Sequence, residues 1–393
     1  MTPADPYSTA DPDGPPPRLR DLGLSPVINA AATLTKLGGS RLAPPVLAAM
    51  AEAAGNFVDL PELHRRVGER LATVTRNEAA YVTSGAAAGM SLAIAGCVTG
   101  LDPATRESFP ARRGTPLPVG WRNRVAICAA QRNPYDYSVR QLGVTVDEFD
   151  ADPSSLGKAL RPDTACVLWF AGEHYAVGAP ELPEVIATAK AAGVPVIVDA
   201  AAQIPPVSAL WHFTGELGAD AVIFSGGKGL RGPQSSGLVL GTHRIIEGTR
   251  LHSSPNHAFG RGMKVGKEEL LGLLAAVEWT VARDETALLT AYEESVRRWV
   301  DGLTGFPGIR VERGYPSEAG QPHGRALLWL DEDSGWTRDS LTDALWRHDP
   351  PVAVGAAGDA VALNPQPLDP GEDLVVLDAV RSVLSAGPAE TAP

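Results

Sequence analysis

The sequence contains few cysteines, no long apolar run and fewer basic than acidic residues, and each shortage argues against a class of protein. Its three cysteines, Cys97, Cys128 and Cys166, lie in apolar segments without paired spacing, which indicates buried free thiols and a reducing, cytoplasmic location. No uncharged apolar run of about 18 residues occurs, so no membrane span is expected. With 34 Lys and Arg against 46 Asp and Glu, the net charge of −12 disfavours a broad nucleic-acid surface.

The length of 393 residues favours one large α/β domain with a smaller one beside it. Apolar β-branched runs alternate with segments of helical spacing, and no internal repeat is evident. The polar, proline-rich start and the final residues cannot bury apolar area, so both are expected to be disordered tails. The predicted division is a tail at 1–24, a large domain with an N-terminal arm at 25–265, a linking helix and small domain at 266–385, and a tail at 386–393.

An apolar run that ends in an acidic residue marks the first candidate site. Residues 194–199 read as a buried parallel strand, and Asp199 is its last residue. Open parallel sheets bind ligands at the carboxyl ends of their strands. The Asp199 carboxylate is therefore expected at the ligand-binding edge of the sheet.

A lysine in a glycine-rich turn marks the second candidate site. The strand at 220–224 leads through Ser225 and two glycines to Lys228, and another glycine follows. Glycines let a backbone approach a ligand closely, although the short motif alone also suits a solvated turn. A lysine amine can hold the aldehyde of pyridoxal phosphate as a Schiff base, and a buried carboxylate such as Asp199 can keep the cofactor's ring nitrogen protonated. The pair therefore predicts a pyridoxal phosphate site.

A third strand end supplies a candidate phosphate site. The strand at 78–83 is followed by residues 84–88, Ser-Gly-Ala-Ala-Ala, which open an alanine-rich helix that runs to about Val98. Ser84 is the expected N-cap, and the free N–H groups at the start of the helix would bind the cofactor phosphate. The same strand, turn and helix occur as plain scaffold in many α/β proteins, so the motif gains weight only beside the other two.

Three segments together resemble the selenocysteine synthase-like family of fold-type I pyridoxal phosphate enzymes. They are VDAAAQ at 198–203, FSGGKGLRGPQSSG at 224–237 and GRGMKVGKEE at 260–269, and the resemblance extends over about residues 26–275. It implies an aspartate aminotransferase-like fold, with a large mixed-sheet α/β domain and a small C-terminal α+β domain. By the same analogy, at least a homodimer is expected.

The resemblance also implies roles for individual residues. Lys228 would carry the cofactor, Asp199 would contact the pyridine nitrogen, and Gln203 would lie near the phenolic oxygen. Arg132, which follows the strand at 124–129, is a further candidate beside the cofactor, and a surface loop is the alternative. The residues expected to bind the phosphate are Ser84, Gly85, Ala86 and Ser225.

Histidines give one catalytic candidate and no metal site. His174 and Glu173 follow the strand at 165–170, so either side chain could contact substrate or act as acid or base, and a solvated loop is an equal alternative. His243, His252 and His257 match no common zinc spacing, so no metal is expected.

The reaction itself is less constrained than the cofactor. The resemblance favours loss of a β-substituent from an amino acid or amino-sugar acid, by elimination or by replacement. Racemisation, aldol-type cleavage, selenocysteine synthesis on seryl-tRNA and non-catalytic cofactor binding stay open. Gly355 and Gln366 stand where family members tend to carry arginines, which suggests a substrate other than a sugar-acid phosphate.

Overall fold

The computed structural model describes residues 14–388 except 110–116 and 118–119. The predicted tails are therefore only partly inside the described residues. In the described part of the predicted N-terminal tail, a short 3-10 helix occupies Leu19–Leu22. The last helix of the chain ends at Ala386, where the predicted C-terminal tail begins. Across this described part of the chain, none of the helices is long and apolar enough to cross a membrane.

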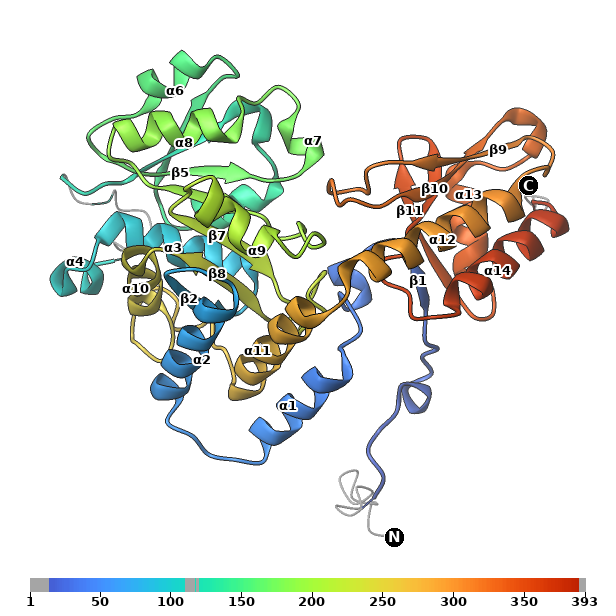
Figure 1. Cartoon of the computed structure of the whole chain (residues 1–393), viewed down its shortest axis with the longest axis horizontal. Coiled ribbons are helices and arrows are strands. Elements are labelled where there is room, and N and C mark those ends of the chain that lie inside the picture. The colour runs from blue at the N-terminus through green and yellow to red at the C-terminus, as the bar shows by residue number, and fades with distance from the viewer. Residues whose placement is uncertain (1–13, 110–116, 118–119, 389–393) are drawn as a thin grey trace, which may run out of the picture.

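A seven-stranded sheet forms the centre of the large domain (Figure 1). Strand β8 pairs antiparallel with β2 and β7, whereas the other neighbours are parallel, so the sheet is mixed as predicted. In order across the sheet, the strands are β2 (Ala79–Thr83), β8 (Gly237–Gly241), β7 (Ala221–Ser225), β6 (Val196–Asp199), β5 (Thr164–Phe170), β3 (Arg124–Cys128) and β4 (Thr145–Phe149).

Helices cover both faces of this sheet, which is why its central strands are apolar on both sides. Ile197 packs into one apolar cluster with α3, α5 and α10, and its neighbour Val198 packs into the other with α2, α8 and α11. The helices are α1 (Pro44–Ala54), α2 (Leu60–Val74), α3 (Ala86–Thr99), α4 (Pro103–Glu107), α5 (Tyr137–Arg140), α6 (Pro153–Ala159), α7 (Glu173–Ala176), α8 (Leu182–Ala191), α9 (Ala209–Trp211), α10 (His243–His252) and α11 (Lys267–Ala282).

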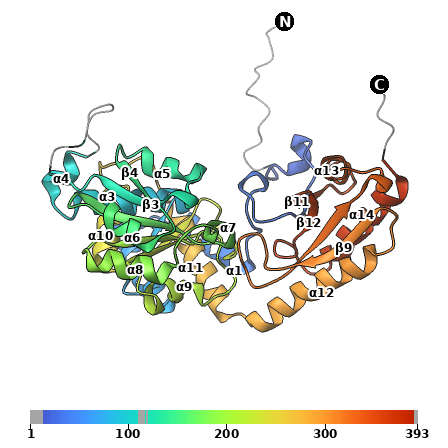
Figure 2. The ribbon, with the colours of Figure 1, turned by 90° about the horizontal axis from the view of Figure 1, so that it is seen from above.

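The small domain has a five-stranded sheet with helices packed on it (Figure 2). Its core contains Trp299 of α12, together with Leu328, Leu345 and Val361. In order across the sheet, the strands are β1 (Ile28–Ala30), β11 (Val352–Ala357), β12 (Ala360–Leu363), β10 (Arg325–Leu330) and β9 (Ile309–Gly314). The helices are α12 (Glu285–Leu303), α13 (Arg338–Trp346) and α14 (Glu372–Ala386).

The domain boundaries differ from the predicted ones at two places. Strand β1 pairs in parallel with β11, so residues 28–30 belong to the small sheet although the prediction placed them at the start of the large domain. The predicted linking helix is two helices, because Asp284 caps α12 with its carboxylate on the N–H of Ala287 at 3.0 Å. Helix α11 packs on the large domain and α12 on the small one, so the boundary lies between them.

Candidate active site

The carboxyl ends of three parallel strands meet at one edge of the large sheet. Phe170 of β5 pairs with Asp199 of β6, and Asp199 pairs with Ile223 of β7. The loops that follow these strands carry His174, the residues after Asp199, and Lys228. The structure thus brings the main predicted residues to the edge where parallel sheets bind ligands.

Asp199 is a buried carboxylate with little compensation from the protein. Its side chain is 8% exposed, and Oδ1 accepts a hydrogen bond from the N–H of Ala201 at 3.0 Å. Burial raises the pKa of Asp199, while the Ala201 hydrogen bond and the charge of Lys228 act in the opposite direction. A buried carboxylate with so few partners is stabilised in its charged form by a cationic group such as a protonated pyridine nitrogen.

The turn that carries Lys228 is packed so closely that its glycines are required. A Cβ on Gly227 would lie 2.5 Å from the Cα of Gln234, and a Cβ on Gly229 would lie 2.0 Å from the carbonyl oxygen of Ile204. Neither position can accept a larger residue without a backbone shift. The backbone on both sides of Lys228 is therefore held in place by its neighbours.

The lysine is half-buried, and the charges of two carboxylates act on it. Ser40 fixes its backbone by donating Oγ–H to the Lys228 carbonyl at 2.6 Å. Burial lowers the pKa of the Lys228 amine, while the charges of Asp199 and Glu318 raise it. An amine with a lowered pKa is more often neutral, which is the form that reacts with an aldehyde or accepts a proton.

At the turn predicted to bind phosphate, the cap of the helix differs from the prediction. Gly85, with φ of 103°, is the N-cap of α3, and no side chain caps the helix, so Ser84 is not the N-cap. A positive φ at this position favours glycine over serine. The first N–H groups of the fourteen-residue helix α3 have no intrahelical partner and form an anion site.

Strand pairing brings Ser225 to the same turn. Ser225 at the end of β7 pairs with Gly237 of β8. Gly237 in turn packs against the cap of α3, since a Cβ on it would lie 2.4 Å from the carbonyl carbon of Gly85. The four residues predicted to hold phosphate, which include Ser84 and Ala86, are therefore gathered in one place.

His174 lies where the small domain meets this edge. It belongs to α7 and is exposed, and both the backbone and the charge of Glu318 act on the pKa of its imidazole. The His174 ring centroid is 3.9 Å from that of Tyr175. Partial burial lowers the pKa of His174, so the neutral imidazole prevails near neutral pH.

Two other predicted residues have protein partners of their own. The Gln203 side chain donates Nε2–H to the carbonyl of Ala319 in the small domain at 2.7 Å. The Arg132 guanidinium forms ion pairs with Asp136 and Glu148. Gln203 thus links the site to the small domain. Arg132, in contrast, is already paired with two carboxylates of the protein.

Glu318 was not predicted as a site residue, and the fold brings it to the site from the small domain. Its charge acts on both Lys228 and His174.

Of the two positions suspected of replacing arginines, Gly355 lies in β11, with Ala362 as its pairing partner. Gln366 is buried and donates Nε2–H to the carbonyl of Ile204 at 2.9 Å, while its Oε1 has no partner among the described residues.

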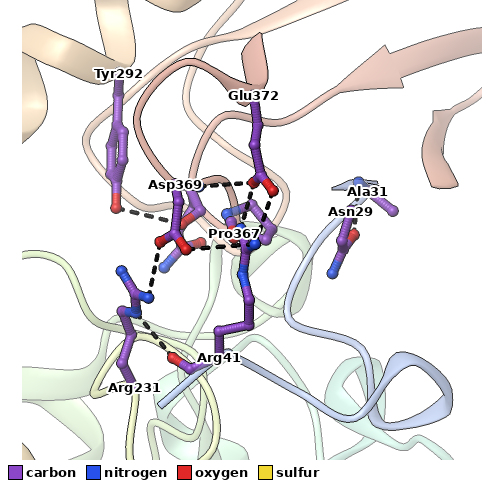
Figure 3. A network of polar contacts seen from close by, with 9 residues as sticks. Asn29, Ala31, Arg41, Arg231, Tyr292, Pro367, Asp369 and Glu372 are labelled. Carbon is purple, nitrogen blue, oxygen red and sulfur yellow. Dashed lines mark hydrogen bonds and ion pairs between the residues drawn. The ribbon is translucent and has the colours of Figure 1, made fainter. Parts of the chain in front are cut away.

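An ion-pair network ties the lysine turn to the small domain (Figure 3). Arg231, three residues after Lys228, donates to Asp369 at 2.9 Å and to the carbonyl of Arg41 at 2.9 Å. Arg41 lies 3.3 Å from Asp369 and also pairs with Glu372 at the start of α14. The position of the small domain is thereby coupled to the turn that carries the lysine.

These features together fit pyridoxal phosphate. The buried carboxylate suits the pyridine nitrogen, the half-buried lysine suits the aldehyde, and the start of α3 suits the phosphate. Within the described ranges, no group of three His, Cys, Asp or Glu side chains is arranged to hold a metal ion.

Comparison with known proteins supports this assignment, although no family model matches the chain. The 5'-C-glycyluridine monooxygenase-decarboxylase of Streptomyces sp is 32% identical over 386 residues, which is 94% of this chain and 93% of that protein. The D-glucosaminate-6-phosphate ammonia lyase of Salmonella typhimurium is 30% identical over 296 residues, 73% of this chain and 76% of that protein. The L-seryl-tRNA(Sec) selenium transferase of Moorella thermoacetica is 27% identical over 393 residues, 89% of this chain and 79% of that protein.

A solved structure shows the same architecture. The structure of D-glucosaminate-6-phosphate ammonia-lyase superposes with a TM-score of 0.80 at 25% identity, over 95% of this chain and 99% of that one. The chain belongs to the selenocysteine synthase-like family of fold-type I, pyridoxal phosphate-dependent enzymes. The predicted family, fold class and cofactor are therefore confirmed.

Proposed function

We propose that this enzyme uses pyridoxal phosphate to form a carbanion at the α-carbon of an amino acid or amino-sugar acid and then expels a β-substituent. The observation that carries the proposal is the placement of the buried Asp199 at the end of β6 and of the half-buried Lys228 in the turn that follows the adjacent parallel strand β7. A relative that is 30% identical is an ammonia lyase, which supports the elimination outcome.

Each predicted residue then has a role. When bound, the cofactor supplies a ring that accepts electrons from the α-carbon. Asp199 would hold the proton on the ring nitrogen, Lys228 would hold the aldehyde, and the Lys228 Nζ would serve as the base for the α-proton of the substrate. Ser225 and the α3 N-terminus at Ser84, Gly85 and Ala86 hold the phosphate.

His174 and Gln203 serve the substrate side of the site. A neutral imidazole at the domain junction is suited to move a proton to or from the departing group, and this is the role we propose for His174. Gln203 positions the small domain through its hydrogen bond to Ala319. Arg132 would reach the cofactor only by giving up its ion pairs with Asp136 and Glu148.

Oxygen-dependent decarboxylation is a second candidate reaction, because the relative that matches more of this chain is a monooxygenase-decarboxylase. The monooxygenase-decarboxylase matches 94% of this chain, whereas the ammonia lyase matches 73%. A reaction of that type also requires an electron-rich α-carbon, so Lys228 and Asp199 would serve it equally. Racemisation, aldol-type cleavage or seryl-tRNA chemistry would use the same two residues, and no separate observation favours them.

The test compares the wild-type protein with Lys228→Ala after incubation with pyridoxal phosphate and a panel of amino acids. Ammonia and a 2-oxo acid from one substrate, absent with the variant, would establish elimination. Lysine-dependent uptake of dioxygen with release of carbon dioxide would establish the oxygen-dependent decarboxylation instead. Product formation by Lys228→Ala at the wild-type rate would contradict both.

We also propose a cytoplasmic homodimer. Phe57 is fully exposed between α1 and α2, and Val58 next to it and Leu47 of α1 are exposed as well. Clusters of exposed apolar side chains mark interaction surfaces. The three cysteines are buried and unpaired, as in a reducing compartment. Light scattering on the purified protein tests the assembly, and a monomeric mass at micromolar concentration would contradict it.

A further inference from the structure

Strand β10 directs one arginine away from the core of the small domain. Ala326 and Leu328 are fully buried in that core, and side chains alternate between the two faces of a strand, so Arg325 lies on the opposite face. Its pairing partner on β9 is Gly314, which has no side chain to pair with it. The arginine therefore takes no part in the packing of α12, α13 and α14 against the sheet.

Charged neighbours place this arginine at the junction of the two domains. The charges of Glu318, in the loop that precedes β10, and of Glu173, in α7 of the large domain, both act on Arg325. Glu318 also acts on Lys228. Hydrogen bonds between this loop and the segment after β6 join the domains at the same point. Arg325 and Lys228 therefore border one site from opposite domains.

The Arg325 guanidinium has charged neighbours but no contact partner among the described residues. Its Nε is buried without a hydrogen-bond acceptor there, and Glu318 and Glu173 act on it through space, without an ion pair. Burial lowers the pKa of Arg325, and the two carboxylates raise it. A buried donor that lacks an acceptor is unfavourable, so the guanidinium gains from a ligand that supplies one. Because the residue as a whole is only half-buried, a ligand can reach the guanidinium.

The other arginines of the small domain are placed differently. Between residues 285 and 388, each of them is exposed or carries an ion pair: Arg297, Arg298, Arg310, Arg313, Arg338, Arg347 and Arg381. The Gln366 amide at the junction is neutral, and its Nε2 already donates to the carbonyl of Ile204 at 2.9 Å. Arg325 is therefore the guanidinium that the described part of the small domain offers to the site.

We propose that Arg325 is a substrate-binding residue, whose guanidinium holds the carboxylate of the substrate amino acid. A planar guanidinium presents parallel N–H donors that match the two oxygens of a carboxylate. In an amino acid the carboxylate is attached to the carbon that bears the amine, so this contact fixes the orientation of the α-carbon toward Lys228 Nζ. The inference rests on the proposed function, because it takes Lys228 as the place where the substrate amine reacts.

The test uses the holoenzyme and two aminooxy reagents, aminooxyacetate and O-methylhydroxylamine. Both react with the aldehyde of the bound cofactor through the same nitrogen and change its absorption, but only aminooxyacetate carries a carboxylate. Stopped-flow absorption gives a second-order rate constant for each reagent, and their ratio is divided by the ratio for pyridoxal phosphate in solution. This corrected ratio measures the preference of the protein for a carboxylate, whichever amino acid is the substrate.

We expect a corrected ratio of at least about ten in the wild type, the size of one hydrogen bond to a charged group. Arg325→Gln should lower the ratio about tenfold and leave the rate with O-methylhydroxylamine unchanged. Arg325→Lys keeps the charge without the planar fork, so its ratio should fall about threefold. The matched control is Arg347→Gln, which removes the same charge at the end of α13, on the core face of the sheet, and should keep the wild-type ratio.

An arginine with a purely structural role gives a different result. Arg325→Gln would then slow both reagents equally and lower Tm, which would overturn the inference. A wild-type ratio near one, or an equal fall in Arg347→Gln, would overturn it as well. If Arg325→Gln does not bind the cofactor, a wild-type ratio in Arg325→Lys has the same consequence. Absence of cofactor absorption in the wild type would instead contradict the proposed function.

Discussion

Replacement of Gly229 by alanine should displace the lysine turn, because the added methyl group has no space. The Cβ would lie 2.0 Å from the carbonyl oxygen of Ile204 and 2.7 Å from its carbonyl carbon. Both atoms are backbone, so no side chain can rotate away. To restore an ordinary contact of about 3.4 Å, the two segments must separate by more than about 1 Å.

A displacement of that size next to Lys228 has two measurable effects. Overpacking of this kind costs about 1–3 kcal/mol of stability, and a misplacement of about 1 Å in a reacting group costs about a hundredfold in rate. We therefore expect Gly229→Ala to lower kcat/KM by about two orders of magnitude and to lower Tm by a few degrees. Steady-state kinetics and thermal unfolding of the holoenzyme measure the two effects.

The matched control is Gly157→Ala, in helix α6, where no atom lies within 4 Å of the added Cβ. This variant should keep wild-type activity and be neutral or slightly more stable, because alanine favours a helix over glycine. Wild-type kcat/KM and Tm in Gly229→Ala would refute the claim that close packing holds the lysine turn.

Three more expectations follow from the same contacts. Asp199→Asn cannot keep the ring nitrogen charged, so kcat should fall by about a hundredfold or more while the cofactor stays bound, as steady-state rates and absorption would show. His252 is fully buried and its pKa is lowered to about 4, below the unfolded value of 6.5, so its contribution to stability is complete above pH 6.5 and decreases as pH falls toward 4. Between pH 7 and pH 5 His252 should contribute a loss of about 2 kcal/mol to urea unfolding, and the total loss should be smaller by about that amount in His252→Asn. Asp369→Asn removes partly exposed ion pairs to Arg41 and Arg231, so stability should fall by less than about 1 kcal/mol while KM rises, and unchanged KM would argue against the domain coupling.

The central residues were predictable because their signals are local. The strand that ends at Asp199 and the glycines around Lys228 are visible within a few residues, and the parallel-sheet rule brings the two strand ends together. The cap of α3 was predicted one residue early, since serine is the commoner cap but the chain needs positive φ at Gly85. Asp284 was a usable cap signal for the break between α11 and α12.

Residues that depend on distant pairing were not predictable in this way. Strand β1 is three residues long and pairs with β11 more than three hundred residues later, so its own sequence does not identify its partner. Glu318 lies at the site because the small domain folds against the large one, where Gln203 and Gln321 form hydrogen bonds between the two domains. Nothing in the local sequence around Glu318 indicates that contact.

The most direct test of the central claim is to locate the cofactor on the chain. The wild-type protein is incubated with pyridoxal phosphate, reduced with borohydride, digested and analysed by mass spectrometry. The account predicts a visible absorption band that reduction removes, one modified peptide with the cofactor on Lys228, and neither in Lys228→Ala. Specific labelling of a different lysine, or an undiminished band in the variant, would contradict it.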